Sequence, residues 1–222
     1  MVLLQQLAMI QLILPKETCA IETSADAGLE TLWPQEFEFI KSAVASRQGE
    51  YSAVRMCARE AMAHLGIPAG PVLNDDKRCP IWPEGIIGSM THCRGYRAAA
   101  LAREGILRSL GIDAEPAEPL PRGVFTRIAT PIEAEVVLAL TGESPDIPWD
   151  RLLFSLKESL YKAWYPLTRT WLGYRDTNLC LRLDGTAEIT VNKAMPAQVA
   201  RPRWYAAWRV VDTLILTAVW AM

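Results

Sequence analysis

One long amphipathic segment in the C-terminal half constrains the fold more than any other feature. Its apolar residues recur at helical spacing: Leu153, Leu156, Leu160 and Trp164. The sequence therefore predicts a helix over residues 149–165, which Pro166 ends because proline disfavours helical backbone before it. Short strand patterns follow this helix at residues 178–183, 187–191, 204–210 and 214–220. A short helix near 131–140 is predicted to precede it.

The N-terminal half offers a comparable set of elements. A helical pattern begins after Trp33-Pro34, and a second covers residues 51–65 before Gly66. Residues 66–88 are rich in Pro, Gly, Asn and Asp, which predicts loops. Two strands, 97–103 and 106–113, are expected to form a hairpin around Glu104-Gly105.

Each half thus combines a substantial helix with strands, and the halves join near residues 110–116. We expect an α+β protein with two pseudo-symmetric lobes, 1–111 and 112–222, each a long helix packed on a small antiparallel sheet, with a cleft between them. The halves share no evident sequence identity, so this expectation rests on element order.

Composition excludes several classes of protein. The 222 residues are 50% hydrophobic with a formal net charge of −2, which argues against disorder and against a nucleic-acid binder that relies on global positive charge. Five cysteines without a Cys-x-x-Cys pair and only two histidines make a structural zinc site improbable and favour a reducing, cytoplasmic location. The apolar opening, residues 1–14, is shorter than the roughly 20 residues of a membrane span. We expect an irregular strand or a docked terminal segment there, and no membrane association.

Two carboxylates lie at the end of the predicted strand 106–113, one on its last residue and one just beyond it. Asp113 and Glu115 lie two residues apart, so both point from one face and repel each other. A solvated strand end would look the same. A bound divalent cation would remove the repulsion, and Mg²⁺ commonly uses one or two protein carboxylates together with substrate phosphates.

The long helix carries a second group of polar residues. Glu158 and Lys162 have the spacing of an ordinary surface ion pair, and taken alone that interpretation is preferred. The same helix also carries Ser155, Tyr161 and Tyr165, which favours a functional face.

A glycine-rich segment and a basic group complete the candidate residues. Gly88-Ser89-Met-Thr91-His92 could approach and donate to phosphate oxygens, although a turn followed by a buried histidine would have the same pattern. Arg47, Arg55 and Lys77 lie upstream, where each could recognise phosphate or simply face solvent.

Together these segments resemble the surfactin-synthetase type of 4'-phosphopantetheinyl transferase, within its enterobactin-associated and actinobacterial branch. The resemblance runs from about Arg47 to Gly173. The matching segments are VRMCAREA (54–61), WPEGIIGSMTHC (82–93), GIDAEP (111–116) and FSLKESLYKAWYPL (154–167).

The resemblance implies a monomeric, Mg²⁺-dependent enzyme that transfers phosphopantetheine from its substrate coenzyme A to a serine of an apo acyl or peptidyl carrier protein, releasing 3',5'-ADP. It implies Mg²⁺ ligands at Asp113, Glu115 and Glu158, and catalytic roles for Glu158, Lys162 and His92. It also implies a set of coenzyme A-binding residues: Arg47, Arg55, Lys77, Ser89, Thr91, His92 and Lys162. Gln48 departs from the second arginine that relatives often carry beside the first.

Two other functions remain compatible with these residues. A non-catalytic module could keep the coenzyme A or carrier-binding surface without turnover. A Mg²⁺-dependent nucleotide phosphohydrolase could use water as the nucleophile and would need no protein acceptor.

Overall fold

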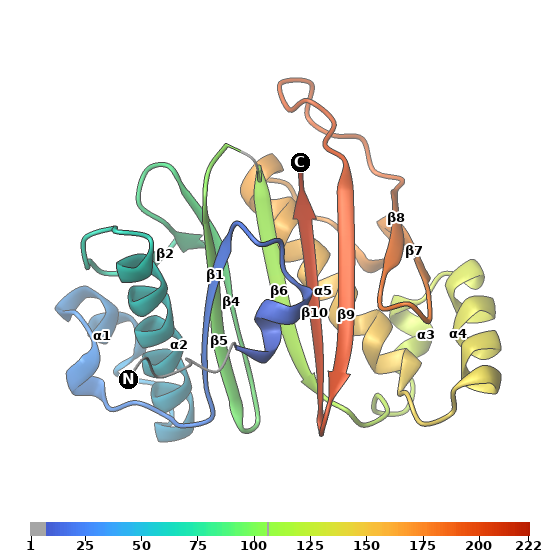
Figure 1. The fold of residues 1–222 in the computed structure, drawn as a ribbon, viewed down its shortest axis with the longest axis horizontal. Coiled ribbons are helices and arrows are strands. Elements are labelled where there is room, and N and C mark those ends of the chain that lie inside the picture. Colours follow the sequence, from blue (N-terminus) through green and yellow to red (C-terminus); the bar gives the residue numbers. More distant parts are fainter. Residues whose placement is uncertain (1–7, 106) are drawn as a thin grey trace, which may run out of the picture.

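The computed structural model describes residues 8–105 and 107–222 and contains two sheet-plus-helix lobes whose strands stand side by side (Figure 1). Part of the apolar opening, residues 1–7, lies outside the described residues, as does Ile106 of the predicted strand. Residues Met9–Ile13 form a 3-10 helix, η1, in which Ile10 and Ile13 are buried. The prediction of a docked terminal segment is confirmed for this described part.

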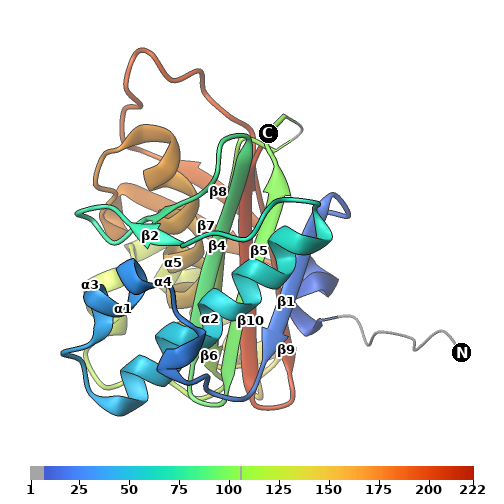
Figure 2. The same ribbon diagram turned by 90° about the vertical axis from the view of Figure 1, so that its left-hand side faces the viewer.

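The N-terminal lobe packs one 20-residue helix, α2 (Ala45–His64), against an antiparallel sheet. In Figure 2, α2 runs diagonally in front of the strands. The sheet has the order β1 (Thr18–Thr23), β5 (Tyr96–Arg103), β4 (Ile86–Cys93). Its other elements are η2 (Leu29–Thr31), α1 (Pro34–Ile40), β2 (Leu73–Asn74) and β3 (Pro80–Ile81).

The C-terminal lobe repeats this plan with a second 20-residue helix, α5 (Trp149–Thr168), lying behind the strands in Figure 1. Its antiparallel sheet has the order β6 (Ser109–Pro116), β10 (Leu214–Ala221), β9 (Trp204–Val211). Gly111 of β6 lets α5 pack closely against the strand, because a Cβ atom at this position would lie 2.0 Å from the Ser159 carbonyl oxygen. The remaining elements are α3 (Phe125–Ile128), α4 (Pro131–Glu143), η3 (Tyr174–Asp176), β7 (Thr177–Leu181) and β8 (Ala187–Val191).

Side-chain hydroxyls join the two lobes where β4 lies beside β6. Ser89 Oγ accepts a hydrogen bond from the Ile112 amide at 3.1 Å, and Thr91 Oγ1 accepts one from the Ala114 amide at 3.0 Å. One apolar cluster also includes buried residues of both sheets and of η1. The lobes are thus fixed to one another beside the strand that carries Asp113.

Each lobe contains a buried glutamate in the same local arrangement. Glu36 and Glu133 are the third residues of helices that begin with proline, and each accepts a hydrogen bond from its own N-cap amide. Each also accepts from the amide of a later segment, that of Val72 at 2.7 Å and that of Leu179 at 2.9 Å. Each pairs with a cation of its lobe's long helix. Arg59 lies 3.0 Å from Glu36, and Lys157 lies 2.8 Å from Glu133.

The strand prediction for residues 97–113 is wrong in its pairing. β5 pairs with β1 and β4, whereas β6 pairs with β10, so the expected hairpin around Glu104-Gly105 is not formed. The hairpin fails because residues 98–102, four of them alanine, are fully buried in a central strand whose two edges are already paired with β1 and β4. β1, one of those neighbours, was not predicted.

One predicted loop and two predicted helix ends are also wrong. The glycine segment is not a loop but most of strand β4, where a Cβ atom at Gly88 would lie 2.8 Å from the Ala100 carbonyl oxygen of β5. Helix α2 begins at Ala45 rather than near Tyr51. The prediction missed its first turns because they are polar and show no apolar periodicity.

Helix α5 continues through Pro166 to Thr168. The Arg169 amide donates to the Tyr165 carbonyl oxygen at 2.8 Å, so the last turn closes beyond the proline.

The other predicted elements are confirmed within a few residues: α1, α4, β7, β8, β9 and β10. The assignment of residues 1–111 and 112–222 to separate lobes stays a prediction, and β6 spans the point at which it divides the chain. Within the described residues, no helix is both long and apolar enough to cross a membrane.

Candidate active site

A cavity of about 730 Å³ brings together almost all of the predicted site residues. It is lined from α2, the β2–β3 segment, β4, β6 and α5, so both lobes contribute. The predicted residues on its wall are Arg47, Arg55, Lys77, Ser89, Thr91, His92, Asp113, Glu158 and Lys162. Glu115 is the predicted residue that does not line it. Of the other polar residues that the sequence singled out on α5, Tyr161 and Tyr165 line the cavity, whereas Ser155 is buried and does not.

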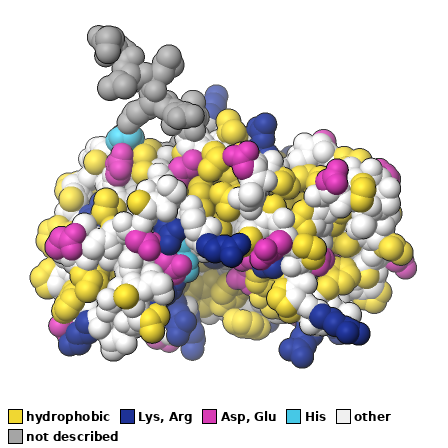
Figure 3. Space-filling view, turned by 90° about the horizontal axis from the view of Figure 1, so that it is seen from below, with side chains coloured by type: hydrophobic (Ala, Val, Ile, Leu, Met, Phe, Trp, Pro, Cys, Tyr) yellow, Lys and Arg dark blue, Asp and Glu magenta, His cyan; other side chains and the backbone are white. Residues whose placement is uncertain are grey.

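The surface carries both signs of charge. Figure 3 shows Lys and Arg side chains next to Asp and Glu side chains near the middle of the face seen from below. This mixture fits a protein of net charge −2 that holds an anionic ligand by specific residues.

Asp113 is buried and held from three sides. Its Oδ1 accepts hydrogen bonds from Lys162 Nζ at 2.8 Å and Thr91 Oγ1 at 3.2 Å, and its Oδ2 accepts one from Ser155 Oγ at 2.9 Å. Glu115 points to the same helix, where its Oε2 accepts from Arg151 Nη1 at 2.8 Å. Burial and the neighbouring charge of Asp113 raise the pKa of Glu115.

Glu158 lies on the α5 side of the cavity and is half-buried. Its Oε1 accepts a hydrogen bond from the hydroxyl of Tyr174. Burial and this bond raise the pKa of Tyr174, so the phenol keeps its proton and remains a donor. Lys162, one turn further along α5, donates to Asp113 and to the Ile112 carbonyl oxygen, the latter at 3.0 Å. The alternative interpretation of Glu158 and Lys162 as an ordinary surface ion pair does not hold, since each contacts other residues.

The donor set suits a hard divalent cation. Asp113, Glu115 and Glu158 offer carboxylate oxygens, which Mg²⁺ prefers as ligands. Among the described residues, no group of three or more Asp, Glu, His or Cys side chains is placed so that it could hold a metal ion. Sites for Mg²⁺ usually need fewer protein ligands, since water and substrate phosphates supply the rest.

His92 lies between two charged residues of α2. Its Nδ1 is 3.2 Å from Glu50 Oε2, and its Nε2 contacts the Arg47 guanidinium. Burial and the charge of Arg47 lower the pKa of His92 to about 4, against the opposing effect of Glu50. The imidazole is neutral at pH 7.

The three basic residues differ in their surroundings. Arg55 is buried, donates to the Val72 carbonyl oxygen at 3.1 Å and to Asn74 Oδ1 at 3.2 Å, and stacks on the Tyr51 ring. Burial lowers its pKa to about 10, so it stays charged at pH 7. Arg47 and Lys77 have side chains that are 45% and 63% exposed and can move toward a ligand.

Three contacts of the predicted residues were not foreseen. Arg151 lies seven residues before Glu158 on α5, so helical spacing could have placed it on the same face. Glu50 is three residues after Arg47, which is the spacing of a helical ion pair. Tyr174 follows α5 in η3, and no local pattern connects it to Glu158.

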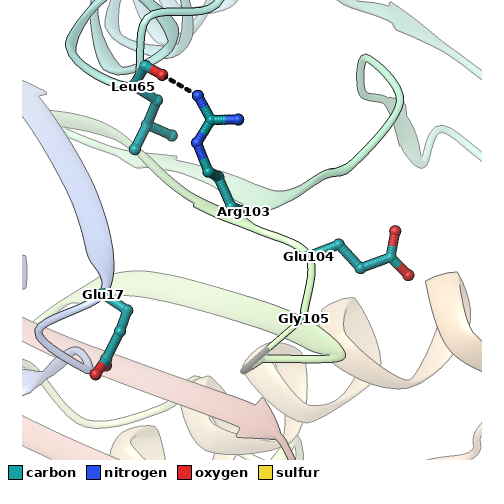
Figure 4. Close-up of a pocket in the computed structure, with 5 residues that line it drawn as sticks. All are labelled: Glu17, Leu65, Arg103, Glu104 and Gly105. Carbon is teal, nitrogen blue, oxygen red and sulfur yellow. Dashed lines mark hydrogen bonds between the residues drawn. The ribbon is translucent and has the colours of Figure 1, made fainter.

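A second hollow of about 440 Å³ lies at the C-terminal end of α2, away from these residues (Figure 4). It is lined by Glu17, Leu65, Arg103, Glu104 and Gly105. Arg103 Nη2 donates to the Leu65 carbonyl oxygen at 2.6 Å and so caps the helix end. None of the predicted site residues lines it.

Known proteins resemble the chain along nearly all of its length. The family model of the 4'-phosphopantetheinyl transferase N-terminal domain matches residues 35–102, and that of the 4'-phosphopantetheinyl transferase superfamily matches residues 109–213. The 4'-phosphopantetheinyl transferase Svp of Streptomyces mobaraensis is 41% identical, covering 90% of this chain and 82% of its own. The 4'-phosphopantetheinyl transferase PptT of Mycobacterium tuberculosis is 40% identical over 86% of each chain. Enterobactin synthase component D of Salmonella typhi is 32% identical over 84% of this chain and 79% of its own.

The chain belongs to the 4'-phosphopantetheinyl transferase family. It is an enzyme of this class, which transfers phosphopantetheine from coenzyme A to carrier proteins. The predicted two-lobed fold and the predicted activity are both confirmed.

Proposed function

We propose that the cavity between the lobes binds coenzyme A and Mg²⁺ and that the enzyme is of the surfactin-synthetase type. The observation that carries this proposal is the convergence on one cavity wall of the predicted phosphate-binding and catalytic residues and of two of the three predicted metal ligands, Asp113 and Glu158. These residues come from segments more than 100 positions apart, Arg47 to Lys162. A shared ligand explains why they meet.

In the proposed complex, Asp113, Glu115 and Glu158 hold Mg²⁺. The ion would neutralise phosphate charge during transfer. Lys162, anchored on Asp113 beside the cavity, faces the leaving phosphate. Ser89 and Thr91 fix β6 and its Asp113 through their hydroxyls.

The proposed reaction is attack of the carrier serine Oγ on the β-phosphorus of coenzyme A. The bond between that phosphorus and the oxygen of 3',5'-ADP breaks, and the serine proton passes to Glu158 directly or through water. Tyr174 donates to Glu158 and so orients its carboxylate. Positioning and charge neutralisation supply most of the acceleration.

The proposed partner is an apo acyl or peptidyl carrier protein, met by a monomeric enzyme in the cytoplasm. Relatives include an enterobactin synthase component, so we place the chain in siderophore or related secondary-metabolite synthesis. Arg122 and Arg127, both exposed and flanking the start of α3, offer positive charge to an acidic carrier surface.

Removal of divalent metal tests the proposed Mg²⁺ requirement. Chelation should abolish carrier modification, and added Mg²⁺ should restore it, because the metal would supply the positive charge that offsets the phosphate charge during transfer. Calorimetry should show tighter coenzyme A binding with Mg²⁺ than without it. Full transfer in excess chelator would contradict the metal assignment.

Glu158→Gln should lower turnover far more than it weakens coenzyme A binding. The amide keeps the shape of the side chain but loses basicity and most of the metal affinity, so we expect a decrease of about 100-fold or more in kcat. Turnover and calorimetric affinity should be measured for the same preparation. Complete rescue by excess Mn²⁺ would leave Glu158 as a metal ligand and remove its role as base.

Arg47→Ala should weaken coenzyme A about tenfold and affect 3'-dephospho-coenzyme A much less. A charge-assisted hydrogen bond is worth roughly 1.5–3 kcal/mol, and Arg47 is exposed enough for its loss to spare the fold. Comparing both ligands with both proteins isolates the contact with the 3'-phosphate. Lys41→Ala, in an exposed pair with Glu38, is the control. Equal weakening of the two ligands would reassign Arg47 to another part of the substrate.

A further inference from the structure

The imidazole of His92 is held at both nitrogens by groups that dictate where its proton resides. A guanidinium can only donate hydrogen bonds, so the contact with Arg47 requires Nε2 to accept. The proton of the neutral ring therefore lies on Nδ1, which is 3.2 Å from a carboxylate oxygen of Glu50.

Glu50 is itself fixed by neighbours on other elements. Its Oε1 lies 3.9 Å from Arg97 of β5, and Arg97 contacts Asp26 at 2.5 Å. Arg97 is 7% exposed, and its Nε is buried without a hydrogen-bond partner in the described part of the chain. Gly49 lets Asp26 approach, since a Cβ atom there would lie 2.9 Å from the Asp26 side chain. The Glu50 carboxylate thus lies between Arg97 and His92.

In this state His92 presents a lone pair, not a proton, at Nε2. Its pKa of about 4 follows from burial and from Arg47, with smaller effects of Lys162 on α5 and Arg97 on β5 in the same direction. Glu50 opposes them and is the negative group that favours the imidazolium. A phosphate accepts hydrogen bonds, so it cannot pair with the unprotonated nitrogen.

We propose that Glu50 is a positioning residue that couples coenzyme A binding to the uptake of one proton by His92. The inference rests on the proposed function, in which His92 contacts a phosphate of coenzyme A. The phosphate displaces Arg47 from Nε2, a solvent proton forms a new N–H bond there, and the imidazolium donates Nε2–H to the phosphate and Nδ1–H to Glu50. No other bond is made or broken.

The coupling has a defined sign. The bound state has the higher His92 pKa, so between the free and bound values each binding event takes up a proton. Coenzyme A affinity should then fall as pH rises through this window, by up to tenfold per pH unit.

Nitrogen NMR of the two histidines tests the inference without any turnover. Because the sequence contains only His64 and His92, ¹⁵N-histidine labelling gives two ring systems, and His64, exposed at the end of α2, is an internal control. At pH 7.5 the free protein should show neutral His92 protonated at Nδ1. Saturation with coenzyme A and Mg²⁺ should convert His92 to the imidazolium and leave His64 unchanged.

Variants separate Glu50 from the rest of the cavity. Glu50→Gln should bind coenzyme A more weakly and leave His92 neutral in the complex, whereas Glu60→Gln, an exposed carboxylate on the same helix, should behave as wild type. If wild type fails to bind coenzyme A, the proposed function itself is wrong. If it binds and His92 stays neutral, or if His92 is protonated equally in Glu50→Gln, the proposed coupling is overturned while coenzyme A binding stands. The wild-type titration decides the proton uptake even if Glu50→Gln does not fold.

Discussion

Replacing Asp113 with asparagine should reduce phosphopantetheinyl transfer by about 100-fold or more in a protein that remains folded. The substitution keeps the volume of the side chain but removes the negative charge that pairs with Lys162 at 2.8 Å and that we assign to Mg²⁺. The amide oxygen can accept from Thr91 as Oδ1 does, and the amide nitrogen can donate to the Ser155 hydroxyl in place of Oδ2, so the loss should appear in transfer before it appears in stability. Initial rates of carrier modification and a urea denaturation curve measure the two effects.

Asp146→Asn is the matched control for this prediction. Asp146 is exposed in the turn before α5 and lies outside the cavity lining. Both variants lose one negative charge, so an unspecific charge effect would slow both. Wild-type rates for Asp113→Asn at physiological Mg²⁺ would remove Asp113 from the site.

Glu133→Gln should lower the free energy of unfolding by about 3–5 kcal/mol, the cost of breaking a buried ion pair by removing one partner. The side chains of Glu133 and Lys157 are 1% and 2% exposed, and burial already lowers the pKa of Lys157. The variant leaves the Lys157 ammonium beside a neutral amide. Urea-induced unfolding followed by tryptophan fluorescence gives the difference.

Two further variants check the cause of that loss. Glu188→Gln breaks an exposed pair with Arg182 and should cost less than about 1 kcal/mol. Adding Lys157→Met to Glu133→Gln removes the unpaired charge, so the double variant should be more stable than the sum of the single effects predicts. Equal costs for Glu133→Gln and Glu188→Gln would show that the buried pair does not stabilise the lobe.

The sequence predicted the helical parts of the fold, and most of the residues that it singled out line one cavity, because these signals are local. The leucine stripe of α5 sets which face of that helix is buried, and the same periodicity leaves Glu158 and Lys162 near the cavity. The spacing of Asp113 and Glu115 correctly placed both carboxylates toward one partner, which proves to be α5.

The sheets were harder to predict because strand pairing depends on residues distant in sequence. Cys19 of β1 pairs with Leu101 of β5, an arrangement that no short pattern in the acidic N-terminal segment indicates. Gly88 was interpreted as letting the backbone approach phosphate oxygens, whereas in the structure it permits close approach to β5 within a strand. For the same reason Tyr174 and Glu50 were not predicted as site residues, since each contacts a residue of another segment.

Mass measurement of a carrier protein tests the central claim most directly. The enzyme is incubated with coenzyme A, Mg²⁺ and an apo carrier, with a carrier whose acceptor serine is replaced by alanine as the control. We expect the carrier to gain one phosphopantetheine group at its serine, with release of one 3',5'-ADP for each carrier modified, and the alanine carrier to stay unchanged. Cleavage of coenzyme A without any carrier would instead show a hydrolase, and binding of coenzyme A without turnover on any carrier would show a non-catalytic module; either result would contradict the account.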